Sequence, residues 1–377
     1  MLRSISLLAS IFLWLVSLAV AQFEPPKVYP VGANPNSVVV ADVNGDGKLD
    51  LVTGNATLAK PNIFNISVLL GNGDGTFQPA ITSAVPFDPS QLVVADMNGD
   101  GIPDLVMTAQ SDLSLSGSVI VMLGDGKGRF GHPASYYAGG AAFYLAVGDV
   151  NHDGKLDVVV TNVTNVSTPS IAVLLGNGNG SLQAPVFYYP PAPNYIILAD
   201  FNKDGYLDIA ATDALLVNEF SQVDVLLNNG DGTFGQYVQY TSDAPGPLAA
   251  ADVNKDGNID LVTATSNGDE FSTDLGNGNG TFQPSIFSHD NTLNIEGLVL
   301  QDFNNDGILD LVCTSGPTGF VYFSKGTGSG TFLQSLKMSS GGKEPTSIAA
   351  ADFNHDGKMD FVVANSLSAN VSVFLHK

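Results

Sequence analysis

One nine-residue pattern recurs seven times in this chain. The pattern is Asp-x-Asn-x-Asp-Gly-x-x-Asp, and its first copy lies within the segment ADVNGDGKLD at residues 41–50. Successive copies begin 50 to 54 residues apart, and every copy matches the pattern at each specified position. A repeat period of this length is typical of stacked supersecondary units. We therefore expect an array of seven similar units rather than one irregular globule.

Each copy, called here an Asp-rich loop, places side-chain oxygens at positions one, three, five and nine. Glycine stands at position six, where the chain must bend sharply. Ca²⁺ takes six to eight oxygen ligands, and a loop with side chains at positions one, three and five and a carbonyl at position seven supplies them. We therefore predict up to seven Ca²⁺ sites. The predicted ligands, with position seven acting through its backbone carbonyl, are Asp42, Asn44, Asp46, Lys48 and Asp50; Asp96, Asn98, Asp100, Ile102 and Asp104; Asp149, Asn151, Asp153, Lys155 and Asp157; Asp200, Asn202, Asp204, Tyr206 and Asp208; Asp252, Asn254, Asp256, Asn258 and Asp260; Asp302, Asn304, Asp306, Ile308 and Asp310; Asp352, Asn354, Asp356, Lys358 and Asp360.

An Asx turn, in which Asp and Asn bind only the local backbone, is the alternative interpretation of each loop. Seven copies without a substitution at any side-chain ligand position favour the metal, as does the mutual repulsion of three carboxylates within nine residues. An EF-hand does not fit, because it requires a Glu at position twelve and helices on both sides. The flanking segments, such as VVVAD and DLVTG, are apolar and β-branched and predict buried strands.

A second motif follows about 20 residues later in six of the repeats. Its first copy is SVLLGNGDGTF, which ends at Phe77, and it predicts a strand, a Gly-rich turn and a further strand. Each repeat then contains four antiparallel strands, which is typical of a propeller blade. The sequence therefore predicts an all-β fold, a seven-bladed β-propeller. Aromatic residues between one blade and the next are expected to pack between blades in the outer strands, namely Tyr136, Tyr137, Phe143, Tyr144, Tyr188, Tyr189 and Tyr195.

The two ends of the chain predict how the ring closes. Phe23 lies 19 residues before Asp42, and 18 to 20 residues separate the end of each later copy of the second motif from the next loop, so residues 22–33 predict a fourth strand without its first three. The last repeat stops at VSVFLHK, after its third strand. We expect the N-terminal strand to complete the seventh blade and so remove free sheet edges. His376 and Lys377 are expected to add little stability.

With these loops and turns, the chain resembles the FG-GAP/VCBS repeat family, whose calcium-bearing seven-bladed propellers include the head of integrin α-subunits. The resemblance covers residues 22–377 as a single domain, and it implies that the loop after the innermost strand of each blade binds calcium. All seven repeats carry that loop here. The Phe-Gly and Gly-Ala-Pro signatures of the animal receptors are absent at the expected place, where residues 52–56 are VTGNA. The resemblance therefore implies the fold and the loops, and not an adhesion-receptor function.

Residues 1–21 contain Arg3, an apolar stretch over residues 5–18 and the small residues Ala19 to Ala21. This is the pattern of a cleavable signal peptide. An uncleaved membrane anchor is the alternative, for which the stretch is short. We expect cleavage near Ala21 and a secreted or periplasmic mature protein that is monomeric and has no membrane span.

The net charge is −23, from 14 basic and 37 acidic residues, and 21 of the acidic residues are loop aspartates. Such a surface does not suit nucleic acid or an anionic membrane. Cys313 is the only cysteine, so no disulfide can form within the chain. Its apolar neighbours favour a buried core residue over a nucleophile.

Nothing in the sequence predicts a catalytic residue or an organic cofactor. The five Glu are scattered, and His152 and His355 occupy position four of their loops, where we expect them to face solvent. Binding is the favoured function, with the partner on the face opposite the Asp-rich loops, where the variable connections between second and third strands lie. Two ligand classes stay open: a protein or surface partner, and a glycan held between blades as in a lectin. The only Trp, Trp14, lies in the predicted signal peptide, which weakens the lectin hypothesis. A polysaccharide-processing enzyme is the least favoured interpretation.

Overall fold

The computed structural model describes residues 22–57, 63–110, 117–162, 171–191, 193–213, 221–242, 246–264, 270–289 and 294–377. The predicted signal peptide, residues 1–21, lies outside these ranges. Within them the structure contains β-strands and one short 3-10 turn, η1 (Ser366–Ser368). Over the same ranges, no helix has the length and apolar character needed to cross a membrane.

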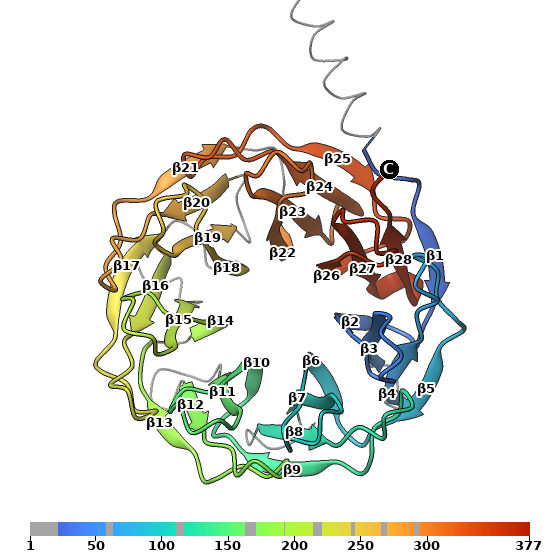
Figure 1. The fold of residues 1–377 in the computed structure, drawn as a ribbon, viewed down its shortest axis with the longest axis horizontal. Coiled ribbons are helices and arrows are strands. Elements are labelled where there is room, and N and C mark those ends of the chain that lie inside the picture. The colour runs from blue at the N-terminus through green and yellow to red at the C-terminus, as the bar shows by residue number, and fades with distance from the viewer. Residues whose placement is uncertain are drawn as a thin grey trace, which may run out of the picture.

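Twenty-eight strands form seven antiparallel four-stranded sheets around a common axis (Figure 1). This confirms the predicted all-β seven-bladed propeller. Blades one to three are β2 (Pro35–Ala41), β3 (Asp50–Thr57), β4 (Ile63–Leu69) and β5 (Ile81–Ala84); β6 (Asp88–Ala95), β7 (Asp104–Gln110), β8 (Ser118–Met122) and β9 (Ala134–Tyr137); β10 (Ala142–Gly148), β11 (Asp157–Asn162), β12 (Ile171–Leu174) and β13 (Val186–Tyr188). Blades four and five are β14 (Pro193–Ala199), β15 (Asp208–Asp213), β16 (Ser221–Leu226) and β17 (Val238–Ser242); β18 (Leu248–Ala251), β19 (Asp260–Ala264), β20 (Glu270–Asp274) and β21 (Ile286–His289). Blades six and seven are β22 (Ile295–Gln301), β23 (Asp310–Ser315), β24 (Phe320–Ser324) and β25 (Leu336–Ser339); β26 (Pro345–Ala351), β27 (Asp360–Asn365), β28 (Asn370–Phe374) and β1 (Lys27–Pro30).

The core lies between the blades. Second strands such as β11, with the sequence DVVVTN, are buried at every residue because a neighbouring blade covers each face. One cluster, for example, joins Val52 and Ile66 of blade one to Leu105 and Met107 of blade two. The innermost strands are less buried, since they face the central channel. Cys313 is fully buried in β23, as the sequence predicted for a core residue.

The N-terminal strand closes the ring as expected. β1 pairs antiparallel with β28, from Lys27 opposite Val373 to Pro30 opposite Asn370, and becomes the outer strand of blade seven (Figure 1). Phe23 is buried and makes an edge-to-face contact with Phe361, with ring centroids 5.0 Å apart.

The last two residues make contacts that the sequence did not predict. The backbone N–H of His376 donates to the carboxylate of Asp360 at 2.7 Å, and His376 forms a β-bridge with Phe23. The N–H of Lys377 donates to the carbonyl of Gln22 at 2.8 Å. These residues take the place that the Gly-rich turn occupies in the other blades, which the sequence could not reveal because the motif itself is missing there.

Six of the seven innermost strands carry a register shift near their first residues, as the pairing of the described residues shows. The shifts lie in β2, β6, β10, β14, β22 and β26. A β-bulge of this kind inserts an extra residue and re-aims its side chain. The affected residues, Glu296 of β22 among them, line a cavity on the propeller axis.

Candidate functional site

The seven Asp-rich loops share one backbone conformation. The glycine at position six has a φ between 79° and 92° in every copy, and position four also has a positive φ, including at His152 and Lys203. A Cβ added at Gly47 would meet no atom within 4 Å. Glycine is needed there for its backbone freedom and not for lack of space.

Hydrogen bonds within each loop fix the side chains of the predicted ligands. In the first loop the N–H of Gly47 donates to Asp42 Oδ2 at 2.7 Å, that of Asp46 to Asn44 Oδ1 at 2.9 Å, and that of Lys48 to Asp46 Oδ1 at 3.0 Å. The other six loops repeat all three bonds. These bonds are those of Asx turns. Asp42 Oδ2 and Asp46 Oδ1 each keep a second lone pair for a further partner, whereas Asp42 Oδ1 already accepts from the N–H groups of Gly45 and Asp46.

The aspartate at position nine has a second role that sequence reasoning missed. Asp50 is fully buried; its Oδ2 accepts from the N–H of Val43 at 3.0 Å and its Oδ1 from the N–H of Gly71 at 2.7 Å. Its Oδ1 thereby ties the Asp-rich loop to the Gly-rich turn of the same blade. The equivalent aspartates bind the matching turn in each other blade, and Asp360 binds His376 instead. The recurring glycine was the available signal, because a Cβ at Gly71 would lie 2.1 Å from the carbonyl oxygen of Leu49.

The charge of these buried carboxylates is poorly compensated. The pKa of Asp50 is raised to about 6, mainly by burial and to a smaller extent by the nearby carboxylates of Asp42 and Asp46, while the two backbone hydrogen bonds act in the opposite direction. The pKa of the equivalent residue is raised in each other blade, first by burial. Among the residues that the structure describes, the ion pairs of these loops involve only the exposed position-five aspartate, as between Lys155 and Asp153 at 3.0 Å.

The donor set of each loop fits a hard cation by its chemistry, because it offers carboxylate, amide and carbonyl oxygens together. In the part of the chain that the structure describes, no three His, Cys, Asp or Glu side chains are grouped so as to hold a metal ion. A bound ion would therefore require the Asn amide and the carbonyl in addition to the carboxylates.

Neighbouring loops also touch each other. The ring of His152, at position four of the third loop, stacks on the ring of Tyr206 in the fourth loop, with centroids 4.4 Å apart and planes 30° apart. His152 and His355 are exposed, as the sequence predicted, and His152 in addition packs against the next blade. The positive φ at position four directs its side chain sideways along the ring of loops.

A cavity of about 600 Å³ lies on the propeller axis. Residues of all seven innermost strands, or directly beside them, line it, and they come from the beginning of each strand. Asn36, for example, is the second residue of β2, whereas the Asp-rich loop follows the end of β2 at Ala41. The cavity therefore lies towards the face opposite the loops, the face that the sequence analysis favoured for a partner.

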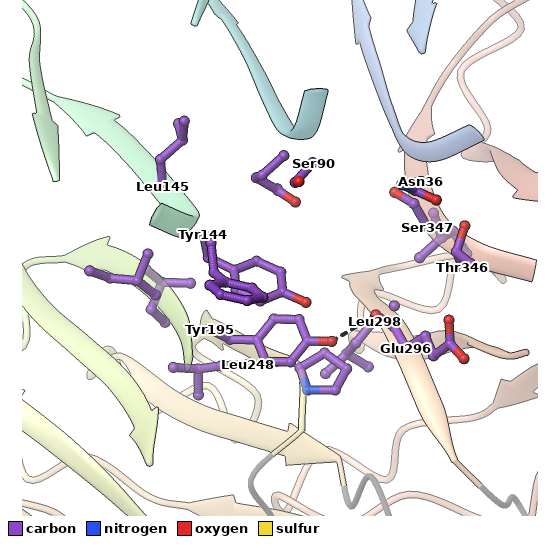
Figure 2. Close-up of a pocket in the computed structure, with 17 residues that line it drawn as sticks. Asn36, Ser90, Tyr144, Leu145, Tyr195, Leu248, Glu296, Leu298, Thr346 and Ser347 are labelled. Atoms are coloured by element: carbon purple, nitrogen blue, oxygen red, sulfur yellow. Dashed lines mark hydrogen bonds between the residues drawn. The ribbon is translucent and has the colours of Figure 1, made fainter. Parts of the chain in front are cut away.

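The cavity wall is aromatic and apolar on one side and polar on the other (Figure 2). The rings of Tyr144 and Tyr195 lie against each other, with centroids 4.1 Å apart and planes 31° apart. The hydroxyl of Tyr195 donates to the backbone carbonyl of Glu296 at 3.2 Å. Across the cavity from the tyrosines lie Asn36, Thr346 and Ser347, whereas Ser90 and Gln91 belong to β6, the strand beside β10 of Tyr144.

Glu296 is the acidic residue of this wall. Burial raises the pKa of its carboxyl to about 7, and the negative charge of Glu344 adds to the effect. The sequence analysis did not single it out for a role, because it is one of five scattered Glu. Phe143, Tyr144 and Tyr195 were expected in outer strands and instead lie on innermost strands β10 and β14; that expectation is wrong for them.

A smaller groove of about 440 Å³ lies between blades six and seven. It is lined by residues of the connection after β23, including Thr318, and by Glu344 and Leu367 of blade seven. This groove is a candidate position for a ligand held between two blades.

Comparison with protein families matches FG-GAP-like repeats at residues 62–107, 109–160, 210–263, 252–313 and 302–363, and an FG-GAP repeat at residues 34–59. The fold and its repeated loops therefore define a repeat-built propeller. These matches cover more than half of the chain, and the protein belongs to the FG-GAP repeat family.

Two curated relatives are phosphatidylinositol-glycan-specific phospholipases D. The mouse protein is 31% identical over 147 residues and the rat protein 31% identical over 149 residues. Each match covers 32% of this chain and spans 17% of the relative. Among solved structures, an Agrocybe aegerita lectin that recognises non-reducing terminal N-acetylglucosamine is similar, with a TM-score of 0.55 and 20% identity over 90% of this chain and 84% of that one. This similarity is one of fold.

Proposed function

We propose that this protein is a secreted, calcium-stabilised propeller that acts as a non-catalytic binding module. The observation that carries this proposal is the cavity on the axis, lined by all seven innermost strands on the face opposite the Asp-rich loops. A concave, mostly apolar cavity with a few polar groups is the usual form of a ligand site. A ring of packed blades is also a rigid scaffold, so a ligand would meet a pre-formed surface.

We include calcium in this proposal because each loop supplies oxygen ligands for it. The side chains at positions one, three, five and nine, with the carbonyl at position seven, would hold the ion. The cation would neutralise carboxylates that otherwise repel one another, and it would thereby stabilise the loops. The loops lie on the other face from the cavity, so calcium supports the scaffold and not the ligand contact.

Two classes of ligand follow from the observations. A protein or surface partner fits the broad face that surrounds the cavity. A glycan is the second candidate, and it is supported by the mixed aromatic and hydroxyl lining of the cavity and by the glycan-binding lectin of similar fold. We do not propose phospholipase activity, because the match to those enzymes spans only 17% of their length.

A glycan array and a cell-surface binding assay, each with calcium and with a chelator, test the proposal. We expect saturable binding in at least one assay with calcium, and weaker binding after chelation because the fold loosens. Binding in neither assay would contradict the binding function. Turnover of a bound glycan, measured as released sugar over time, would contradict the non-catalytic assignment.

A further inference from the structure

We propose that the axial cavity is a saccharide site that holds the end of one neutral glycan per propeller. This inference rests on the proposed binding function and adds the ligand class, the location and the stoichiometry. It places the glycan on the axis and not between blades.

The aromatic wall suits the apolar face of a sugar ring. A pyranose presents several C–H groups on one face, and aromatic rings have a negative face that attracts such groups. Tyr144 and Tyr195 are both only partly buried, and they lie side by side at the cavity wall (Figure 2). The hydroxyl of Tyr195, in blade four, donates to the backbone carbonyl of Glu296, in blade six, and this bond holds the Tyr195 ring in place.

The opposite wall suits the hydroxyl groups of the same ring. Asn36 and Ser347 lie on this wall and Gln91 beside Tyr144, on three different blades, and amide and hydroxyl groups both donate and accept hydrogen bonds. A sugar hydroxyl also donates and accepts, so the sugar and the cavity wall can each complete their hydrogen bonds.

Charge selects against an anionic ligand. The residues that line the cavity include Glu296 and, among those described, no Lys or Arg. A phosphorylated or carboxylated sugar would therefore have no counter-charge in the cavity, and above about pH 7 the ionised Glu296 carboxylate would also repel it. A neutral sugar meets no such penalty.

The size and asymmetry of the cavity set the stoichiometry. About 600 Å³ lies within the range of small-molecule sites and suits one or two sugar units. The residues supplied by the seven strands differ from blade to blade, since Tyr195 of blade four has Gly297 of blade six and Ser347 of blade seven as its counterparts. A site on the axis therefore binds one ligand, whereas sites between blades could recur around the ring.

The test is titration calorimetry on the mature, calcium-loaded chain. The probes are N-acetylglucosamine, glucose and chitobiose as neutral sugars, with N-acetylglucosamine 6-phosphate as the anionic comparison. We expect at least one neutral probe to bind with a stoichiometry near one and the anionic probe to bind at least tenfold more weakly.

Variants locate the site. Tyr144→Ala is expected to weaken binding at least tenfold, and Tyr144→Phe only a few fold, because it keeps the ring. Asn36→Ala and Gln91→Ala leave the tyrosine pair intact and should each weaken binding severalfold without changing the melting temperature. Thr318→Ala and Leu367→Ala, in the groove between blades six and seven, are the matched controls and should bind as the unmodified protein does.

Three outcomes would overturn the inference while leaving the binding function standing. Loss of binding in the Thr318 and Leu367 variants, with full binding in the axial ones, would place the glycan between blades. A stoichiometry of several sugars per chain would also place the glycan between blades. A protein that binds cell surfaces but none of the neutral sugars would exclude the saccharide class. Absence of binding in the array and in the surface assay is the separate result that contradicts the binding function itself.

Discussion

The aspartate at position nine differs from the other acidic residues of its loop in being buried. In the first loop, Asp50 accepts hydrogen bonds from two backbone N–H groups, whereas the exposed Asp46 binds only within its own loop. A buried N–H that loses its acceptor costs about 1 to 3 kcal/mol. The two residues should therefore contribute to stability in different ways, although both are predicted calcium ligands.

We expect Asp50→Ala to lower the free energy of unfolding by about 2 to 4 kcal/mol even in a chelator, because two buried donors lose their acceptor. Asp46→Ala should change stability in the chelator by less than about 1 kcal/mol and should remove one of the bound ions. Denaturant unfolding in EDTA, with metal analysis of the calcium-loaded proteins, measures both quantities. Equal losses of stability in EDTA would show that Asp50 does not fasten the loop as described.

Asp224 is a second buried carboxyl with an unusual environment. It lies on β16, its Oδ1 accepts from the side chain of Gln239 at 3.0 Å, and its Oδ2 is buried without a hydrogen-bond partner. Burial raises its pKa to about 7, with a further contribution from the charge of Asp213. The folded protein therefore retains a proton that the unfolded chain, with an ordinary Asp pKa, has already lost.

This difference predicts the sign of a pH effect. Between about pH 4 and pH 7 the stability contributed by Asp224 should fall as the pH rises, and above about pH 7 it should change no further. Asp224→Asn should remove this dependence and should be more stable than the unmodified protein at pH 8, by on the order of 2 to 4 kcal/mol. Urea unfolding at pH 5 and pH 8 measures the difference. Asp231→Asn, on an exposed turn where hydrogen bonds from Thr233 lower the aspartate pKa, is the control and should not alter the pH dependence in this range.

At the scale of single elements, the seventh blade is the one built from both ends of the chain. β1 supplies its outer strand, and Phe23 packs against Phe303 of blade six as well as Phe361 of blade seven. The last residues complete the same blade through the bonds of His376 and Lys377.

Removal of residues 22–33 should expose the edge of β28 and leave the aromatic cluster around Phe361 open. An unpaired apolar edge invites pairing with other chains. We expect aggregation or a much lower melting temperature, observed by gel filtration and calorimetry. A truncated protein that stays monomeric with unchanged melting would contradict closure by the N-terminal strand.

Removal of His376 and Lys377 should cost about 1 to 3 kcal/mol, because the buried carboxylate of Asp360 loses the N–H of His376. A chain that lacks only Lys377 is the matched control, and it should lose less, since it keeps that bond. Denaturant unfolding of the full chain, the chain without Lys377 and the chain without both residues gives the order of their stabilities. If both trimmed chains matched the full one, the bond to Asp360 would contribute nothing.

At the scale of the whole molecule, the distribution of charge separates the two faces. The 21 loop aspartates account for most of the 37 acidic residues and lie on one face, and the net charge is −23. The axial cavity lies towards the other face. Ion binding and ligand binding can therefore be examined separately.

The mature protein should bind up to seven Ca²⁺, one in each loop. A ligand that binds only the folded state stabilises it, by about 2.7 kcal/mol for a site at 100 times its dissociation constant. We therefore expect chelation to lower the melting temperature by many degrees. Metal analysis after gel filtration, with calorimetry before and after EDTA, is the measurement. No bound metal together with unchanged melting would leave the loops as Asx turns only.

The sequence by itself determined the repeat, the four strands of each blade, the number of blades and the strand that closes the ring. These features follow from local chemistry that a short segment carries: apolar β-branched runs form strands, and Gly at a positive φ forms the turn, as at Gly47. The loop ligands were predicted in the same way, and their binding of calcium stays a prediction.

Only the tertiary structure decided the cavity and the fastening of the loops. The cavity exists because bulged strands of blades one, four and six bring Asn36, Tyr195 and Glu296 to one axis. No local sequence pattern indicates that these distant residues meet. The bond from Gly71 to Asp50 crosses 21 residues of sequence, and the bond from His376 to Asp360 replaces a motif that is absent. Pairing between strands and packing between blades place these groups, because their positions depend on segments distant in the chain.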